Sequence, residues 1–150
     1  MTEPDEGNQL IVVGVDGSPS SKGALRWAVH QAQLTASAVE AVTAWEYPEL
    51  PGPLPADFNP EELARRVLES AIEEAVGATP PVEVRRVAIE GHPAPTLVDA
   101  SKGASLLVVG NRGHGEFVGV LIGSVSLHCV AHAECPVVIL RGPGPGKVSW

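Results

Sequence analysis

Five short apolar runs, separated by longer segments with helical spacing, are the most regular pattern in this chain. The first run, LIVVGV over residues 10–15, is continuous and rich in β-branched residues, which is typical of a strand buried on both faces. The run over residues 82–89 is more polar and alternates, which favours a strand at the edge of a sheet. The pattern predicts strands over residues 10–15, 38–45, 82–89, 105–110 and 137–140.

Four segments between these runs carry apolar residues at helical spacing. Ser20 or Ser21 is predicted to cap the first helix, which runs to about Thr35. The second helix is predicted to begin at Pro60 after the cap residue Asn59, and to expose one polar side. The remaining helices are predicted over residues 95–102 and 124–132, and the apolar side of the second helix is predicted to consist of Leu63, Val67, Ile72 and Val76.

Strict alternation of strands and helices predicts a parallel sheet that is covered on both faces. We predict an α/β fold with a single doubly wound domain over residues 1–150, loose termini at 1–8 and 142–150, and the strand order 3-2-1-4-5. In that order the first and fourth strands are neighbours where the winding direction reverses. Ligands of such sheets bind outside the carboxyl ends of the strands at this point.

Composition narrows the range of partners. The formal net charge is -8 and the sequence pI is near 5.0, so the surface repels nucleic acid and anionic lipid. The first nine residues are polar and acidic, unlike a signal peptide, and no apolar segment is long enough to span a membrane. Two cysteines do not form a disulfide framework in a chain of 150 residues. We therefore expect a cytoplasmic protein that binds neither nucleic acid nor membrane.

The segment LLVVGNRGHGEFVGVLIGS, residues 106–124, places five glycines directly after a buried strand. It contains neither the Walker pattern nor the dinucleotide pattern, but it does contain Gly110-x2-Gly113-x9-Gly123-Ser124. Glycines let the backbone turn with its N–H groups inward, and the start of the following helix attracts negative charge. Arg112 adds a cation for phosphate oxygens. The alternative is a flexible connector whose glycines serve close packing.

This glycine motif resembles the nucleotide-binding signature of the universal stress protein family. The opening LIVVGVDGSPSSKGALRWA and the late segment AECPVVIL are also similar to that family, so the likeness runs from about Gln9 to Arg141. The resemblance implies a fold of the adenine-nucleotide hydrolase-like group and binding of ATP, AMP or cyclic AMP. It also implies a homodimer that forms through the last strand, Val137 to Leu140.

The resemblance also implies roles for individual residues. Asp16 would contact the adenosine part and could help to hold Mg²⁺ beside ATP, although Asp16 could equally cap the turn after the first strand. The backbone near Ala44 would contact the adenine edge. With Arg112 from the loop itself, the implied nucleotide-binding residues are Asp16, Ala44, Val109, Gly110, Arg112, Gly113, Gly123, Ser124 and Val125. Substituting Gly110 by alanine or Gly123 by valine is expected to abolish nucleotide binding while the fold survives, because the added Cβ atoms would intrude on the phosphate-binding backbone.

Three functions remain open at this stage. The first is an ATP-binding, stress-response regulatory protein with at most slow hydrolysis, because the sequence offers no nucleophile and base as partners. The second is an enzyme of adenylyl or phosphoryl transfer that uses the same crevice, and the third is a dimeric adaptor without nucleotide. A metal site is not expected, although His128, Cys129, His132 and Cys135 lie close together in the sequence. Trp45 and Tyr47 either shield an adenine or pack under the loop over residues 46–59.

Overall fold

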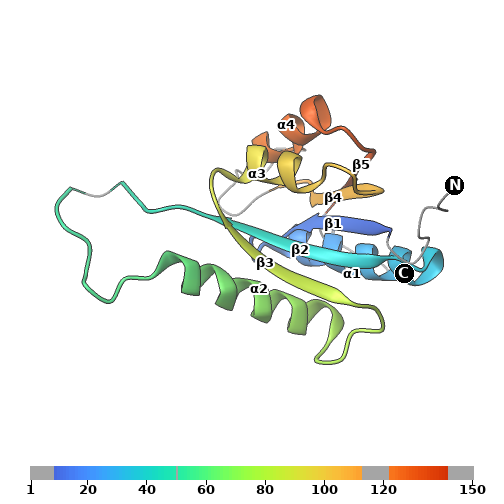
Figure 1. Cartoon of the computed structure of the whole chain (residues 1–150), viewed down its shortest axis with the longest axis horizontal. Coiled ribbons are helices and arrows are strands. Elements are labelled where there is room, and N and C mark those ends of the chain that lie inside the picture. Colours follow the sequence, from blue (N-terminus) through green and yellow to red (C-terminus); the bar gives the residue numbers. More distant parts are fainter. Residues whose placement is uncertain (1–8, 50, 113–121, 142–150) are drawn as a thin grey trace, which may run out of the picture.

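The computed structural model describes residues 9–49, 51–112 and 122–141. Within them, five parallel strands form one sheet in the order β3-β2-β1-β4-β5, and four helices connect the strands (Figure 1). The strands are β1 (Leu10–Gly14), β2 (Ala38–Trp45), β3 (Val84–Glu90), β4 (Leu106–Gly110) and β5 (Val137–Leu140). The helices are α1 (Pro19–Thr35), α2 (Pro60–Val76), α3 (Pro93–Ala100) and α4 (Ser124–His132). The predicted strand order and alternation are confirmed.

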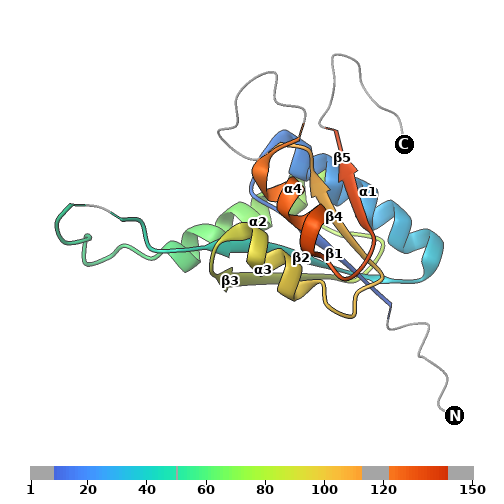
Figure 2. The same cartoon turned by 90° about the horizontal axis from the view of Figure 1, so that it is seen from above.

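The sheet is covered on both faces, α1 and α2 lying on one side and α3 and α4 on the other (Figure 2). Neighbouring residues of β1 point to opposite faces. Ile11 therefore belongs to the core with Leu25 and Leu68, whereas Val12 belongs to the core with Leu97. Each fully buried side chain of this size stabilises the fold by about 2 kcal/mol, which is why β1 had to be apolar on both faces.

The ends of two helices differ from the prediction. Ser18, rather than Ser20 or Ser21, caps α1, because its Oγ accepts a hydrogen bond from the Ser21 N–H at 3.2 Å. Pro19 then occupies the first helical position, where a missing N–H costs nothing. Pro93 does the same for α3, so that this helix covers residues 93–100 instead of 95–102.

The apolar side predicted for α2 is wrong at two positions. Leu63 is 49% exposed and Val67 is 38% exposed. The side of α2 that packs against the sheet instead combines two large residues with alanines, and it consists of Ala64, Leu68, Ala71 and Ile72. Alanines let the helix approach the sheet closely, and counting only large apolar residues overlooks them.

The thiol of Cys129 is fully buried in the core between α4 and the sheet. Burial and, secondarily, the nearby Cys135 raise the pKa of this thiol from 9.0 to about 11. The unfolded chain therefore loses this proton first as the pH rises. The thiol's contribution to the free energy of unfolding is constant well below pH 9.0, and it falls by about 3 kcal/mol as the pH rises through and past the folded pKa of about 11.

Chemical denaturation of the wild type and of Cys129→Ala at a series of pH values measures this effect. The wild type is expected to lose stability more steeply than the variant above pH 9.0, because the wild type alone carries this buried thiol. Parallel curves would contradict the assignment to Cys129.

No helix in the described part of the chain combines the length and the apolar composition that crossing a membrane requires.

Candidate functional site

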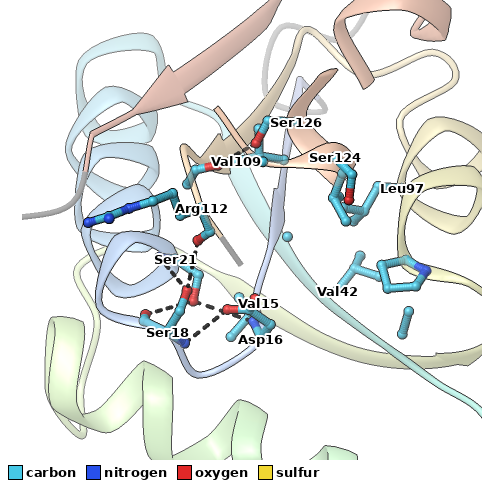
Figure 3. Close-up of a pocket in the computed structure, with 16 residues that line it drawn as sticks. Val15, Asp16, Ser18, Ser21, Val42, Leu97, Val109, Arg112, Ser124 and Ser126 are labelled. Carbon is cyan, nitrogen blue, oxygen red and sulfur yellow. Dashed lines mark hydrogen bonds between the residues drawn. The ribbon is translucent and has the colours of Figure 1, made fainter. Parts of the chain in front are cut away.

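A cavity of about 380 Å³ opens at the carboxyl ends of β1, β2 and β4, against the start of α4 (Figure 3). These ends meet at the point where the strand order reverses, as expected for a doubly wound sheet. Eight of the nine residues implied by the sequence line it: Asp16, Ala44, Val109, Gly110, Arg112, Gly123, Ser124 and Val125. The ninth, Gly113, lies outside the described residues.

One wall of the cavity is apolar. Val42 of β2, Leu97 of α3 and Val109 of β4 form it. An ideal Cβ placed on Gly14 would approach Leu97 Cδ1 to 2.7 Å, so α3 lies close above the end of β1. The sequence did not single out Val42 or Leu97, because a buried valine or leucine carries no local signal that it faces a cavity rather than another side chain.

A turn after β1 forms the polar wall. Asp16 Oδ1 accepts a hydrogen bond from the Ser18 N–H at 2.9 Å, and the Asp16 N–H donates to Ser21 Oγ at 3.4 Å. Gly17 has a φ of +84°, which favours glycine. Asp16 thus shapes the turn and also borders the cavity, so the two alternatives for this residue are compatible. Ser18 and Ser21 gather beside Asp16 (Figure 3).

Hydrogen bonds fix the end of β4 in place. Ser20 Oγ donates to the Arg112 carbonyl at 2.6 Å, and Ser126 Oγ donates to the Gly110 carbonyl at 2.6 Å. The N–H of Asn111 donates to the Leu140 carbonyl at 2.7 Å. Arg112 therefore borders the cavity with a fixed backbone, while its guanidinium extends along α1, away from the apolar wall (Figure 3).

Gly110 lines the cavity with its backbone, but a side chain at this position would point toward α1. An ideal Cβ on Gly110 would come within 2.7 Å of the carbonyl carbon of Ser20, which is backbone and cannot move aside. The expectation that a methyl group at position 110 blocks the ligand and spares the fold is therefore corrected. This glycine allows β4 and the first turn of α1 to approach each other.

The start of α4 offers backbone donors to the cavity. Gly123, the cap residue, provides no side chain, and its own N–H donates to the Asn111 carbonyl at 2.6 Å. The first intrahelical hydrogen bond runs from the Leu127 N–H to the Gly123 carbonyl. The N–H groups of Ser124, Val125 and Ser126 precede it, and no side chain caps this end within the described residues. These amides and the helix dipole attract an anion, whereas Ser18 already caps α1.

Other candidate residues lie elsewhere. Neither Trp45 nor Tyr47 borders the cavity among its described lining residues; their rings contact each other edge to face, with centroids 5.7 Å apart. The rings of His128 and His132 lie 4.4 Å apart on α4. In residues 9–49, 51–112 and 122–141, no group of three or more His, Cys, Asp or Glu side chains is arranged to hold a metal ion.

Comparison with known proteins relates this architecture to one family. A family profile described as "Universal stress protein family" matches residues 7–141. Universal stress protein Rv2623 of Mycobacterium tuberculosis is 38% identical to the chain, and the match covers 87% of this chain and 47% of that protein. The chain therefore spans about half the length of the curated relatives that it matches.

Solved structures show the same fold. A universal stress protein crystallised in complex with cAMP is 29% identical, has a TM-score of 0.62, and matches over 90% of this chain and 98% of its own. The universal stress protein from Archaeoglobus fulgidus in complex with dAMP is 24% identical, has a TM-score of 0.65, and matches over 88% of this chain and 97% of its own.

Proposed function

Because this chain belongs to the universal stress protein family, we propose that it binds an adenine nucleotide in the cavity at the carboxyl end of the sheet. One observation carries the proposal: the amides at the start of α4, which no side chain of the described residues caps, and the apolar wall made by Val42 and Leu97 border the same cavity. An adenine nucleotide has a flat apolar base and an anionic phosphate, so it needs both surfaces. The related protein that was crystallised with cAMP supports this ligand class.

The nucleotide would lie across the cavity with its base toward β2 and its phosphate at α4. Ala44 and Val42 border the end where the base would fit, and Asp16 borders the middle, where a carboxylate can accept hydrogen bonds from ribose hydroxyls. Ser124 and Val125 border the phosphate end. In this arrangement, Val109 and the backbone of Arg112 would form the wall behind the ribose.

We propose ATP as the ligand, with AMP and cyclic AMP as alternatives, since all three share the adenosine part. If ATP binds, Mg²⁺ would accompany it, because this ion is commonly held by phosphate oxygens and one or two carboxylates. Asp16 is the carboxylate that lines the cavity in the described part of the chain.

The role that fits this site is regulatory binding in a stress response, inside the cytoplasm. Among the described lining residues there is no histidine and no cysteine to act as base or nucleophile. Binding can act as a signal only if the ligand has unequal affinity for two states of the protein. The alternatives are a transferase that uses the same cavity and an adaptor that binds no nucleotide.

Calorimetric titration with ATP, AMP and cyclic AMP tests the proposal. We expect saturable binding of at least one of them, and mass spectrometry of the denatured protein is expected to identify an adenine nucleotide that was carried through purification. Protein that carries no nucleotide and binds none of the three would refute the proposal. Multiple-turnover hydrolysis that Asp16→Ala abolishes would favour the enzyme.

We further propose a homodimer through β5. This strand lies at one edge of the sheet, where its backbone groups can pair with another strand, and Val137, Val138 and Ile139 are only half-buried. On the neighbouring α4, Leu127 is 57% exposed and Val130 is 55% exposed. A second copy would cover these apolar side chains.

Sedimentation velocity tests this dimer. The wild type is expected to sediment as a dimer, and Val130→Asp is expected to shift the protein to monomer because a carboxylate would be buried in the interface. Leu34→Asp is the matched control, since Leu34 is 69% exposed near the end of α1 and belongs neither to β5 nor to α4. A monomeric wild type would contradict the dimer.

A further inference from the structure

A second hollow, of about 380 Å³, lies between the carboxyl end of β2 and the first half of α2. Trp45 of β2, Phe58 of the loop before α2 and Leu63 of α2 line it, and we call it the α2 groove. It shares Asp16 and Ala44 with the nucleotide cavity. Its other lining residues belong to β2, α2 and the loop between them, so that it lies on the α2 side of the sheet.

Apolar side chains are exposed at this groove. Leu63 and Val67 are separated by one helical turn, line the groove together, and are 49% and 38% exposed. Tyr47, adjacent to the groove residues Glu46 and Pro48 in sequence, is 55% exposed. Exposed apolar side chains that border a hollow on a folded protein commonly mark an interaction surface.

A polar donor at the same place lacks an acceptor. The indole nitrogen Nε1 of Trp45 is buried and has no hydrogen-bond partner among the described residues. A buried N–H without an acceptor is destabilising, and native proteins rarely leave one. This orphaned donor lies on a residue that lines the groove, so the packing around Trp45 is not complete in the described part of the chain.

The charge around the α2 groove is negative. Asp16 and Glu46 line it, and its described lining contains no lysine, arginine or histidine. The sequence over residues 46–62 holds five carboxylates and no basic residue. Glu61 and Glu62 pair with Arg65 and Arg66, which leaves the other three without an ion pair to α2 in the described part of the chain. Glu46 contacts His92 at 3.0 Å, but this pair is half or more exposed to water and leaves the carboxylate accessible. A second copy of this chain would bring like charges together, whereas a cationic partner complements them.

We propose that the α2 groove docks a basic, amphipathic peptide segment of another protein. Apolar side chains of that segment would cover Leu63 and Val67, and its lysine or arginine side chains would face Glu46. This surface lies on the side of α2 and is separate from the β5 edge that the dimer would use. The partner would thus bind in a groove that adjoins the nucleotide cavity at the carboxyl end of the sheet.

Selection of short random peptides displayed on phage, with the full chain as bait, tests the proposal. The selected peptides are expected to combine lysine or arginine with leucine, phenylalanine or tryptophan. A fluorescent synthetic copy of the best peptide is then titrated by anisotropy. Leu63→Ser and Glu46→Lys are each expected to weaken its binding about tenfold.

Two matched controls separate docking from general attraction to an acidic protein. Leu34→Ser removes a leucine of α1 that is 69% exposed, against 49% for Leu63, and Glu73→Lys adds the same charge change at the far end of α2. Both are expected to bind the peptide within about twofold of wild type. Selection of acidic or of no peptides, or equal binding to all four variants, would overturn the proposal. AMP binding is measured in a separate titration of the same proteins. Loss of nucleotide binding can therefore be distinguished from loss of peptide binding.

Discussion

Gly110→Ala is expected to lower the free energy of unfolding by about 3 kcal/mol, the upper part of the range for overpacking. The added methyl group would lie 2.7 Å from the carbonyl carbon of Ser20, far inside normal contact distance. Ser20 cannot move aside, because its Oγ also donates to the Arg112 carbonyl at 2.6 Å. Urea denaturation followed by circular dichroism measures the change, and any loss of nucleotide binding is expected to accompany the loss of stability.

Gly23→Ala is the matched control for this substitution. Gly23 lies within α1, and an ideal Cβ at this position meets nothing within 4 Å. The change is therefore expected to raise the free energy of unfolding by about 0.5–1 kcal/mol, since alanine loses less conformational entropy in a helix. If the Gly110→Ala protein keeps wild-type stability and loses only nucleotide binding, the sequence-based interpretation is right and a methyl group at position 110 blocks the nucleotide.

Ser124→Glu is expected to weaken AMP binding at least about thirtyfold, or about 2 kcal/mol. Ser124 is exposed at the first position of α4, where its amide belongs to the group that no described side chain caps. A carboxylate at this position would compete with the phosphate for those amides and repel it. The folded protein is expected to keep or slightly gain stability, by about 0.5 kcal/mol, because an acidic side chain is favourable at a helix start. Calorimetric titration measures the affinity.

Ser124→Gln tests whether charge or size is responsible. Glutamine has the shape of glutamate without its charge, so this variant is expected to retain binding within about threefold of the wild type. Raising the salt concentration should restore part of the affinity lost in Ser124→Glu, because screening weakens repulsion between exposed charges. Equal losses in both variants would indicate a steric effect and would argue against a phosphate at this helix start.

Interactions between residues that are close together in the sequence determine much of this architecture. The continuous run at Leu10–Gly14 needs both faces buried, and Asn59 with Pro60 marks a helix start by contacts within one turn. These signals depend on neighbouring residues, which is why the order of elements and the parallel sheet were predictable. The glycine motif likewise indicated which strand end to examine, and eight of its implied residues border one cavity.

The tertiary structure decided what those residues face. The sequence alone placed Leu63 and Val67 in the core, but α2 packs its alanine-containing side on the sheet and leaves them at a groove. Gly110 borders the cavity as expected, but a Cβ at this position would point at Ser20, which is ninety residues away in the chain. Local periodicity determines whether a segment becomes a helix or a strand. Which side of it is covered depends on packing between distant segments, which no single stretch of sequence encodes.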